Sequence, residues 1–239
     1  MFSHAFAAGA LLGTAISPLV CVSAAERSPV AAAEDVVARV TPSAKGAVLF
    51  HLNPDQGNKI TISGIAGGIR VEASDVRRLV AGYGWYLKNI AKVHFSWNGN
   101  RITLPSPLPV PASPVTVESP WNIVFAYNYC TLSYTAAFWD WNRWQREIDF
   151  LALNGFTHAL VTAGLEKTWE DFLTGLGYPR EKALRFIPNP AFAAWWNMGN
   201  LEGHGGPLSQ QQINKMAQMG RRIVSRMEQL GMTPVLQGY

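Results

Sequence analysis

The sequence predicts an α/β protein built in two parts, and three observations support this prediction. Residues 26–104 combine short apolar runs with one amphipathic helical pattern, which is typical of a small αβ domain. Residues 105–120 contain six prolines, which favours an extended linker between domains. Residues 121–239 then alternate apolar strands with long helical segments, as parallel strands with helical crossovers do.

The overall composition is that of an ordinary globular protein. Hydrophobic residues make up 48% of the chain and charged residues only 15%, so the chain can bury a sizeable core. The net charge of +4 is small, and the basic residues do not gather into a stripe. We therefore expect no nucleic-acid partner.

The first 25 residues resemble a secretory signal peptide. Ala5 to Val20 is apolar and is followed by a small-residue cleavage site around Ser23-Ala24-Ala25, although no Lys or Arg precedes the apolar run. A membrane-spanning helix is the alternative, but the run is short and contains Pro18. We expect export, with a secreted or periplasmic location (lysosomal in a eukaryote) and no membrane span in the mature chain.

Two strands and a helix are expected in residues 26–90, after an Ala-rich segment that predicts either a disordered lead-in or a short helix. Ala47–Leu52 and Lys59–Ile65 have the apolar patterns of strands, and the segment between them has strong turn residues. Gly64, Gly67 and Gly68 predict a second flexible break. A helix should begin after Ser74 as its N-cap, and its Gly82 and Gly84 suggest close packing against a neighbour.

A β-hairpin should follow this helix. Val93–Trp97 and Arg101–Leu104 flank Asn98-Gly99-Asn100, which is a strong turn signal.

The cysteines and histidines give no sign of a disulfide, metal site or cofactor. Removal of the signal would leave Cys130 as the only cysteine, and its position after an apolar run is typical of a small buried side chain. The five His residues are far apart, and no Cys/His pair has metal-ligand spacing. We expect no cofactor.

The segment from Asn128 to Gly155 organises the second half of the chain. It reads NYCTLSYTAAFWDWNRWQREIDFLALNG and predicts a helix over Phe138–Leu153, with Gly155 ending it in a left-handed conformation. Apolar strands precede it at Ile123–Tyr127 and follow it at Thr157–Ala163. Arg143 and Glu147 lie four residues apart and should form a solvated ion pair.

The same segment resembles the alpha-N-acetylglucosaminidase family of glycoside hydrolases (family 89), and two further blocks extend the resemblance. Residues 189–208 read NPAFAAWWNMGNLEGHGGPL and are similar to the family's pocket segment. Residues 231–239 read GMTPVLQGY and are similar to its third barrel strand. The resemblance runs from about Val71 to the end of the chain and is strongest after Trp121.

The resemblance implies a small N-terminal αβ domain followed by a (β/α)8 TIM barrel. Further expected elements are a long helix from Ser209 to Leu230 and a strand at Thr233–Leu236. Only three barrel strands can therefore be counted. A complete barrel takes about 250 residues, whereas residues 121–239 amount to about half of that. We expect an incomplete barrel, the front part of a longer protein.

Barrel chemistry lies in the loops after the carboxyl ends of the strands. After the first strand, Asn128, Cys130 and Tyr134 match family residues that line the pocket for terminal N-acetylglucosamine. After the second strand, Glu166 could act as an acid or base, or could be a carboxylate held at a helix N-terminus. The family has a Glu at this place that is not one of its catalytic pair.

The long connection before residue 208 supplies the other expected substrate-binding residues. Trp195 and Met198 match the family's pocket Trp and Met, and such side chains suit a sugar ring and an acetamido methyl group. This sequence departs from the family pattern with Trp196-Asn197 between them and with Glu202-Gly203-His204 further on. A covering for the barrel rim is the alternative role of this segment.

The resemblance implies an exported exo-acting enzyme that removes terminal α-linked N-acetylglucosamine from glycans by a retaining mechanism. Its two carboxylates would follow Tyr239, so we expect no catalytic residue in this chain and no activity from the chain alone. The alternative is a non-catalytic carbohydrate-binding protein derived from the same family.

Overall fold

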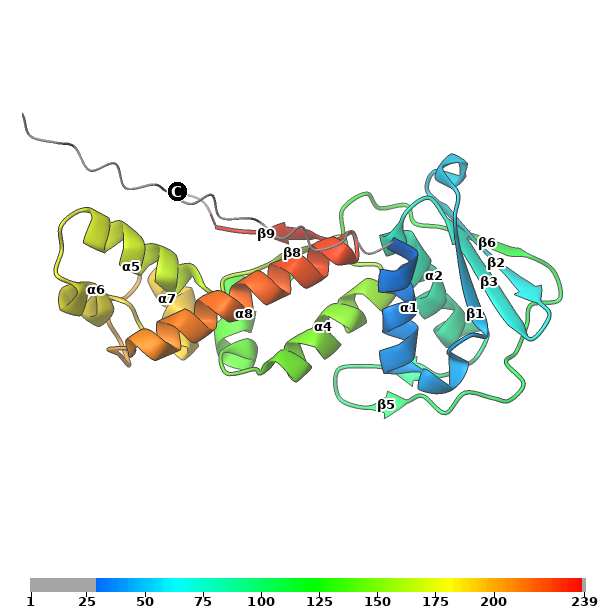
Figure 1. The fold of residues 1–239 in the computed structure, drawn as a ribbon, viewed down its shortest axis with the longest axis horizontal. Helices are drawn as coiled ribbons and strands as arrows, with labels where there is room; N and C mark the ends of the chain where they lie inside the picture. The colour runs from blue at the N-terminus through cyan, green and yellow to red at the C-terminus, as the bar shows by residue number, and fades with distance from the viewer. Residues whose placement is uncertain (1–28, 238–239) are drawn as a thin grey trace, which may run out of the picture.

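The computed structural model describes residues 29–237 of the chain, and the expected signal peptide (residues 1–25) lies outside them. Figure 1 shows two halves along the long axis of the molecule. The elements of the N-terminal half are α1 (Pro29–Val40), β1 (Val48–Leu52), β2 (Lys59–Ile65), β3 (Gly68–Ala73), α2 (Val76–Asn89), β4 (His94–Phe95), β5 (Asn100–Arg101) and β6 (Val115–Glu118). Short 3₁₀ turns lie at Pro42–Ala44 and Pro54–Gln56.

The second half begins with β7 (Phe125–Ala126). It continues with α3 (Tyr129–Thr131), a π-helical turn at Leu132–Ala136, α4 (Trp141–Leu153), β8 (His158–Leu160), α5 (Leu165–Gly175), α6 (Arg180–Phe186), a 3₁₀ turn at Pro190–Phe192, α7 (Ala193–Asn197), α8 (Gln210–Gln229) and β9 (Thr233–Val235).

The N-terminal half contains a four-stranded mixed sheet in the order β1-β3-β2-β6. β1 and β3 are parallel, whereas β2 is antiparallel to both β3 and β6. The buried residues alternate with exposed ones along β1, as expected for a sheet with one face toward the core. The hairpin β4–β5 forms at the predicted place, but as a separate two-stranded sheet.

Two predictions for this half are corrected. The glycine-rich segment after β2 is not only a break, because Gly68 begins β3, whose Val71 and Ala73 are fully buried. The proline-rich segment is extended as predicted but is not a linker throughout, because its proline-free residues 115–118 form β6 at the edge of the sheet. Prolines flank this strand and lie outside the pairing, as the missing N–H of proline requires.

Helices α1 and α2 cover one face of this sheet and lie between it and the second half (Figure 1). The Ala-rich segment forms helix α1. Asp75, rather than Ser74, is the N-cap of α2, since its side chain accepts a hydrogen bond from the Arg78 backbone N–H at 2.8 Å. The predicted close packing of Gly82 is confirmed, because a Cβ there would lie 2.5 Å from the Ile60 side chain.

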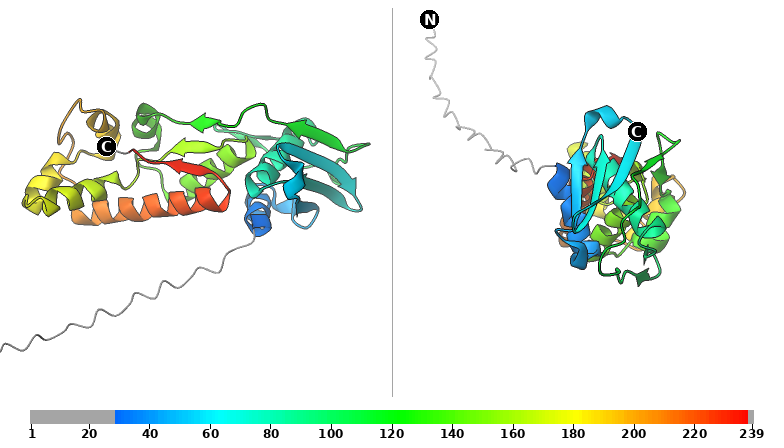
Figure 2. Two further views of the ribbon diagram at one scale, coloured as in Figure 1. Left: turned by 90° about the horizontal axis from the view of Figure 1, so that it is seen from above. Right: turned by 90° about the vertical axis from the view of Figure 1, so that its right-hand side faces the viewer.

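The second half contains three parallel strands in the order β7-β8-β9. Each strand is shorter than the apolar run that predicted it, but all three lie within the predicted ranges. Helices α4 and α8 make the crossovers, and Figure 2 shows α8 running along one side of the strands. Ser209 is the N-cap of α8 and forms a reciprocal capping box with Gln212.

Helix α4 begins at Trp141, with Asp140 as its N-cap, three residues later than predicted. Trp144, Ile148 and Leu151 are buried on one face, as their spacing indicated. Gly155 ends the turn after the helix with φ of 77°. The predicted pair of Arg143 and Glu147 forms at 2.8 Å, but it is not solvated as expected, because the Glu147 side chain has no exposed surface.

The two halves share one continuous core, which includes Tyr83 and Tyr86 of α2 and Ile148 and Leu151 of α4. Gly84 allows the close approach, because a Cβ at this position would lie only 1.8 Å from the carbonyl oxygen of Leu153. A smaller cluster forms around the buried Ile187, Trp196, Leu208 and Ile213. Within residues 29–237, the helices are too short or too polar to cross a bilayer.

Candidate functional site

Segments after the carboxyl ends of the parallel strands meet at one end of the second half. Ser133, in the turn that follows α3, ties the first segment to the connection before α7. Its buried hydroxyl donates to the Pro190 carbonyl oxygen at 3.1 Å and accepts from the Ala194 N–H at 2.9 Å. After β9, the side-chain amide of Gln237 donates to the Asn197 carbonyl oxygen at 3.2 Å. These contacts fix the segments around a common rim.

Tyr134 and Trp195 come together across this rim. Their ring centroids lie 5.1 Å apart and the rings are nearly perpendicular, at 85°. Tyr134 is 77% exposed, although an aromatic side chain of this size usually buries much of its surface. The pair borders an open hollow of about 700 Å³, which we call the outer hollow. It is lined by Ser133, Tyr134, Thr135, Ala137, Phe138, Trp139, Ala191, Phe192, Trp195 and Leu201.

The other three predicted substrate-binding residues do not line this hollow. Asn128 is exposed and caps α3, because its Oδ1 accepts from the Thr131 N–H at 2.9 Å. Cys130 is a half-buried free thiol on α3. Met198 is 42% exposed, directly after α7. Helices α3 and α7 nevertheless contact each other, so these residues lie on neighbouring elements. Their binding role stays a prediction.

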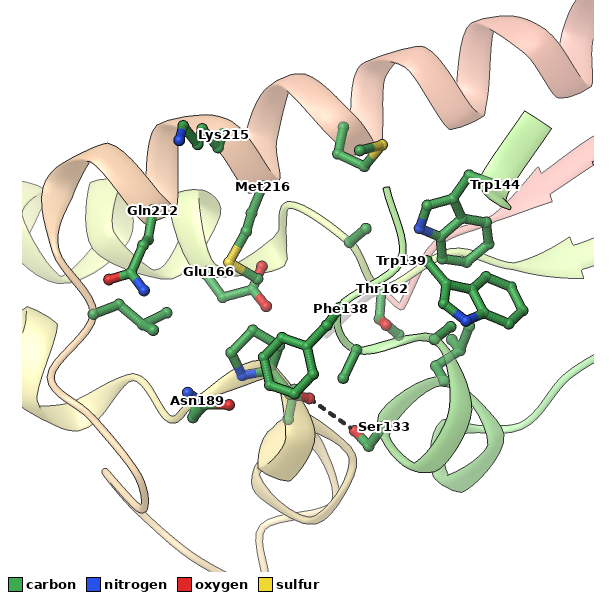
Figure 3. Close-up of a pocket in the computed structure, with 18 residues that line it drawn as sticks. Ser133, Phe138, Trp139, Trp144, Thr162, Glu166, Asn189, Gln212, Lys215 and Met216 are labelled. Carbon is green, nitrogen blue, oxygen red and sulfur yellow. Dashed lines mark hydrogen bonds between the residues drawn. The ribbon is translucent and has the colours of Figure 1, made fainter. Parts of the chain in front are cut away.

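A second, smaller space adjoins the outer hollow, and we call it the inner cavity; Figure 3 shows the residues that line it. It has a volume of about 350 Å³. The two spaces share Ser133, Ala137, Phe138 and Trp139, so these residues form a common wall. The rest of the inner cavity is lined by Leu132, Ala136, Trp144, Thr162, Ala163, Glu166, Asn189, Pro190, Ala193, Leu208, Gln212, Lys215, Met216 and Met219.

Glu166 is the carboxylate of the inner cavity, and Figure 3 shows its side chain directed into it. The residue is 3% exposed and lies in the first turn of α5, where its Oε2 accepts from the Gly164 N–H at 3.1 Å. Burial raises the pKa of Glu166 to about 7, against backbone hydrogen bonds that lower it. The carboxylate is therefore held at a helix N-terminus, which is one of the two predicted alternatives, and it also faces a cavity. A role as acid or base stays a prediction.

Tyr127 lies where β7 ends and the first segment begins. Its backbone φ is 76°, which is rare for a residue with a bulky side chain. Its hydroxyl donates to Glu147 Oε1 at 2.5 Å. Burial, and then the adjacent Glu147 carboxylate, raise the pKa of Tyr127 well above its usual value.

The residues around the two spaces offer mainly apolar, aromatic and amide groups for contact with a ligand. Among the described residues that line the two spaces, Glu166 is the sole carboxylate. Hydrolysis of a glycoside needs two carboxylates that flank the scissile bond. Within residues 29–237, no cluster of three His, Cys, Asp or Glu side chains could hold a metal ion.

Several site residues were missed or misjudged from the sequence. Phe138 and Trp139 were assigned to the helix, but they precede it and form the wall between the two spaces. Trp196 is buried, packs on Trp169 in the smaller cluster and lines neither of the two spaces. His204, one of the departures from the family pattern, packs against Phe192, with the two ring centroids 4.4 Å apart. Helical periodicity could not reveal the positions of Phe138 and Trp139, because both residues lie in the turn before α4.

Two family models match this chain in order. The model of the alpha-N-acetylglucosaminidase N-terminal domain matches residues 31–110, and the model of the TIM-barrel domain of the same family matches residues 124–239. The match therefore begins well before Val71, where the resemblance was expected to start.

Proteins of known identity agree with these models. The chain is 38% identical over 176 residues to the human protein named alpha-N-acetylglucosaminidase, and the match covers 74% of this chain and 24% of the human one. The structure is similar to that of a family 89 glycoside hydrolase from Clostridium perfringens in complex with 2-acetamido-1,2-dideoxynojirimycin. The TM-score is 0.84 at 31% identity, with 88% of this chain and 24% of the other covered. A second structure from Clostridium perfringens, in complex with its substrate GlcNAc-alpha-1,4-galactose, gives the same TM-score and coverage at 30% identity.

The chain thus spans about a quarter of the length of these relatives. The expected α/β architecture with the first strands of an incomplete TIM barrel is confirmed by the parallel sheet, the barrel-domain match and the structural similarity. From the two matched domains and these relatives, we conclude that the chain belongs to the alpha-N-acetylglucosaminidase family, glycoside hydrolase family 89.

Proposed function

We propose that this chain is part of an exo-acting glycoside hydrolase that removes terminal α-linked N-acetylglucosamine from glycans. Family membership supports the reaction, and a solved relative binds GlcNAc-alpha-1,4-galactose as its substrate. The role of this chain would be to hold the terminal sugar at the rim of the barrel.

The observation that carries this proposal is the edge-to-face pair of Tyr134 and Trp195. The two rings come from different segments, and both contribute to the outer hollow. Exposed aromatic faces at the carboxyl ends of barrel strands suit the apolar face of a sugar ring. Asn128, Cys130 and Met198 would add polar and apolar contacts from α3 and from the end of α7.

The proposed mechanism is retaining, and the reacting carboxylates would lie in sequence beyond residue 239. One would act as nucleophile and the other as acid and then base, about 5–5.5 Å apart. Glu166 is not one of this pair in our proposal. Its buried carboxyl lies behind the rim and would shape the inner cavity instead.

Residues 1–25 would act as a signal peptide, so we propose that the protein is exported. N-terminal sequencing of exported protein should then give a first residue between Ala24 and Glu26. Exported protein that still begins with Met1 would contradict this part of the proposal.

A non-catalytic carbohydrate-binding protein is the second candidate. The single carboxylate among the described residues lining the two spaces favours it. Both candidates require recognition of N-acetylglucosamine, whereas only the first requires hydrolysis.

Titration of the chain with N-acetylglucosamine, followed by NMR of the indole N–H groups, tests the shared requirement. We expect saturable shifts of the Trp195 indole signal, assigned with Trp195→Phe, and weaker or no shifts with glucose, which lacks the acetamido group. Equal responses to both sugars, or none to either, would contradict the proposal.

A further inference from the structure

Glu147 is a buried carboxylate that receives three hydrogen bonds from three different parts of the chain. Its Oε1 accepts from the Tyr127 hydroxyl at 2.5 Å and from the Trp97 indole N–H at 2.7 Å, and its Oε2 accepts from the Arg143 guanidinium at 2.8 Å. A charge without exposed surface is costly unless donors of this kind surround it. The position of Glu147 is therefore fixed by its partners, and theirs by Glu147.

One partner connects Glu147 to the predicted substrate-binding residues after β7. Tyr127 holds the rare positive φ directly before Asn128, and its hydroxyl is the group that Glu147 anchors. Such a conformation is unfavourable for a residue with a bulky side chain and persists only where the surroundings hold it. The φ angle of Tyr127 sets the direction in which the chain leaves β7. The hydrogen bond from Tyr127 to Glu147 therefore also sets the position of α3, which carries Cys130.

The second partner connects Glu147 to the wall of the two spaces. The Arg143 guanidinium lies 4.0 Å from the centroid of the Trp139 ring, in a cation–π contact. Trp139 lines both the outer hollow and the inner cavity, and it packs edge-to-face on Trp144 at 5.1 Å. Arg143 thus links the carboxylate to an aromatic side chain that faces both spaces.

The third partner comes from the N-terminal half. Trp97 lies at the tip of the hairpin formed by β4 and β5, and it is 40% exposed. The same hairpin is held on α4 by Arg146, which donates to the Ser96 carbonyl oxygen at 2.6 Å and covers the Phe95 ring at 4.6 Å. The hairpin therefore positions Trp97, whose indole N–H donates to Glu147 Oε1, the same oxygen that accepts from the Tyr127 hydroxyl.

We infer that Glu147 is a positioning residue for the sugar site, through which the N-terminal hairpin sets the geometry of the loop after β7. Trp97 fixes the carboxylate, the carboxylate fixes Tyr127, and Tyr127 directs α3 toward the rim. This inference rests on the proposed sugar site for its functional consequence, but the placement of α3 can be measured without any sugar.

The thiol of Cys130 on α3 is a suitable probe. The sequence holds two cysteines, so Cys21→Ser leaves Cys130 as the only reactive thiol. In this background we would compare Trp97→Phe, Tyr127→Phe and the double variant, each of which removes a donor and keeps an aromatic ring. Trp121→Phe is the matched control, because Trp121 is 70% exposed and lies outside the Glu147 contacts.

The rate of Cys130 modification by 5,5′-dithiobis(2-nitrobenzoate) should rise about fivefold in Tyr127→Phe and in Trp97→Phe, the equivalent of about 1 kcal/mol for one lost hydrogen bond. The double variant should react no faster than Tyr127→Phe, because Trp97 acts on α3 through Tyr127. The control should match the parent protein. The thermal midpoints of the single variants should fall by no more than about 4 °C below that of the control, as one lost hydrogen bond implies in a chain of this size, which separates positioning from a loss of overall stability.

Binding of N-acetylglucosamine, measured on the same proteins, separates this inference from the proposed function. We expect the dissociation constant to rise about fivefold in both single variants and to stay unchanged in the control. Unchanged thiol rates in the single variants, or effects that multiply in the double variant, would overturn the positioning role. A parent protein that fails to bind the sugar would overturn the proposed function instead, while the thiol rates would still decide the role of Glu147.

Discussion

The guanidinium of Arg39 on α1 donates to both carboxylate oxygens of Asp149 on α4, at 2.7 and 2.9 Å. Arg226 on α8 also approaches Asp149 Oδ1, at 3.3 Å. Asp149 and Arg226 are 2% and 6% exposed at their side chains, so the ion pair lies inside the junction of the two halves. This contact joins α1 to two helices of the barrel part.

Asp149→Ala should lower the free energy of unfolding by about 3–5 kcal/mol, because it removes the carboxylate that the buried Arg226 contacts at 3.3 Å. Urea unfolding followed by circular dichroism would measure this loss. Glu181→Ala is the matched control, since it removes an exposed carboxylate paired with Arg185 at 2.8 Å and should cost less than about 0.5 kcal/mol. Equal losses in the two variants would show that the buried contact does not join the halves.

Gly84→Ala should destabilise the junction between α2 and α4. The added Cβ would lie 1.8 Å from the Leu153 carbonyl oxygen, a backbone atom that cannot move aside. Gly175→Ala is the control in a second helix, because nothing lies within 4 Å of its added Cβ and alanine favours the helix by up to about 1 kcal/mol. Thermal unfolding should show a lower midpoint for Gly84→Ala and an equal or higher one for Gly175→Ala.

Most of the fold could be predicted from the sequence, because its elements depend on local patterns. The face of α4, the long helix at residues 209–230, the hairpin and the close packing at Gly82 follow from spacing and residue type. The strand β6 was missed, because its four residues lie among prolines and gain their pairing only from β2. The burial of Glu147 was missed for a similar reason, since two of its donors, Trp97 and Tyr127, are distant in sequence.

The candidate site was predicted less completely. Tyr134 and Trp195, which the resemblance assigned to one pocket, contact each other although they lie 61 positions apart in sequence. Their role in binding stays a prediction. The inner cavity was not foreseen, because it is formed by side chains from α8, α4 and several turns, each with an ordinary local pattern. Only the assembled structure brings Glu166, Trp139 and Met216 to one space.

Glu166 should make stability depend on pH between about 5 and 8. Its pKa is about 7 in the folded protein, above its ordinary value of 4.5. Between these values the folded state binds a proton that the unfolded state has released, so the free energy of unfolding falls as the pH rises. In Glu166→Gln this contribution is absent, and the fall should be smaller by roughly 3 kcal/mol. If the free energy of unfolding changed with pH equally in the parent protein and in Glu166→Gln, the raised pKa of Glu166 would be contradicted.

Tyr134→Ala and Trp195→Ala should each weaken binding of N-acetylglucosamine by about 1–3 kcal/mol, because each removes aromatic contact with the sugar. Tyr178→Ala is the control, since Tyr178 is 54% exposed in the connection between α5 and α6 and lines neither the outer hollow nor the inner cavity. Isothermal titration calorimetry would measure the affinities. A loss of affinity in Tyr178→Ala as large as that in Tyr134→Ala would mean that the sugar does not bind at the outer hollow.

Hydrolysis of aryl N-acetylglucosaminides tests the proposed activity most directly. The assay would compare the 239-residue chain with the protein extended by its natural downstream sequence, on both the α- and the β-linked substrate. We predict that the extended protein hydrolyses the α-linked substrate and leaves the β-linked one intact, while the 239-residue chain hydrolyses neither. Hydrolysis by the 239-residue chain itself, or a preference of the extended protein for the β-linked substrate, would contradict the account.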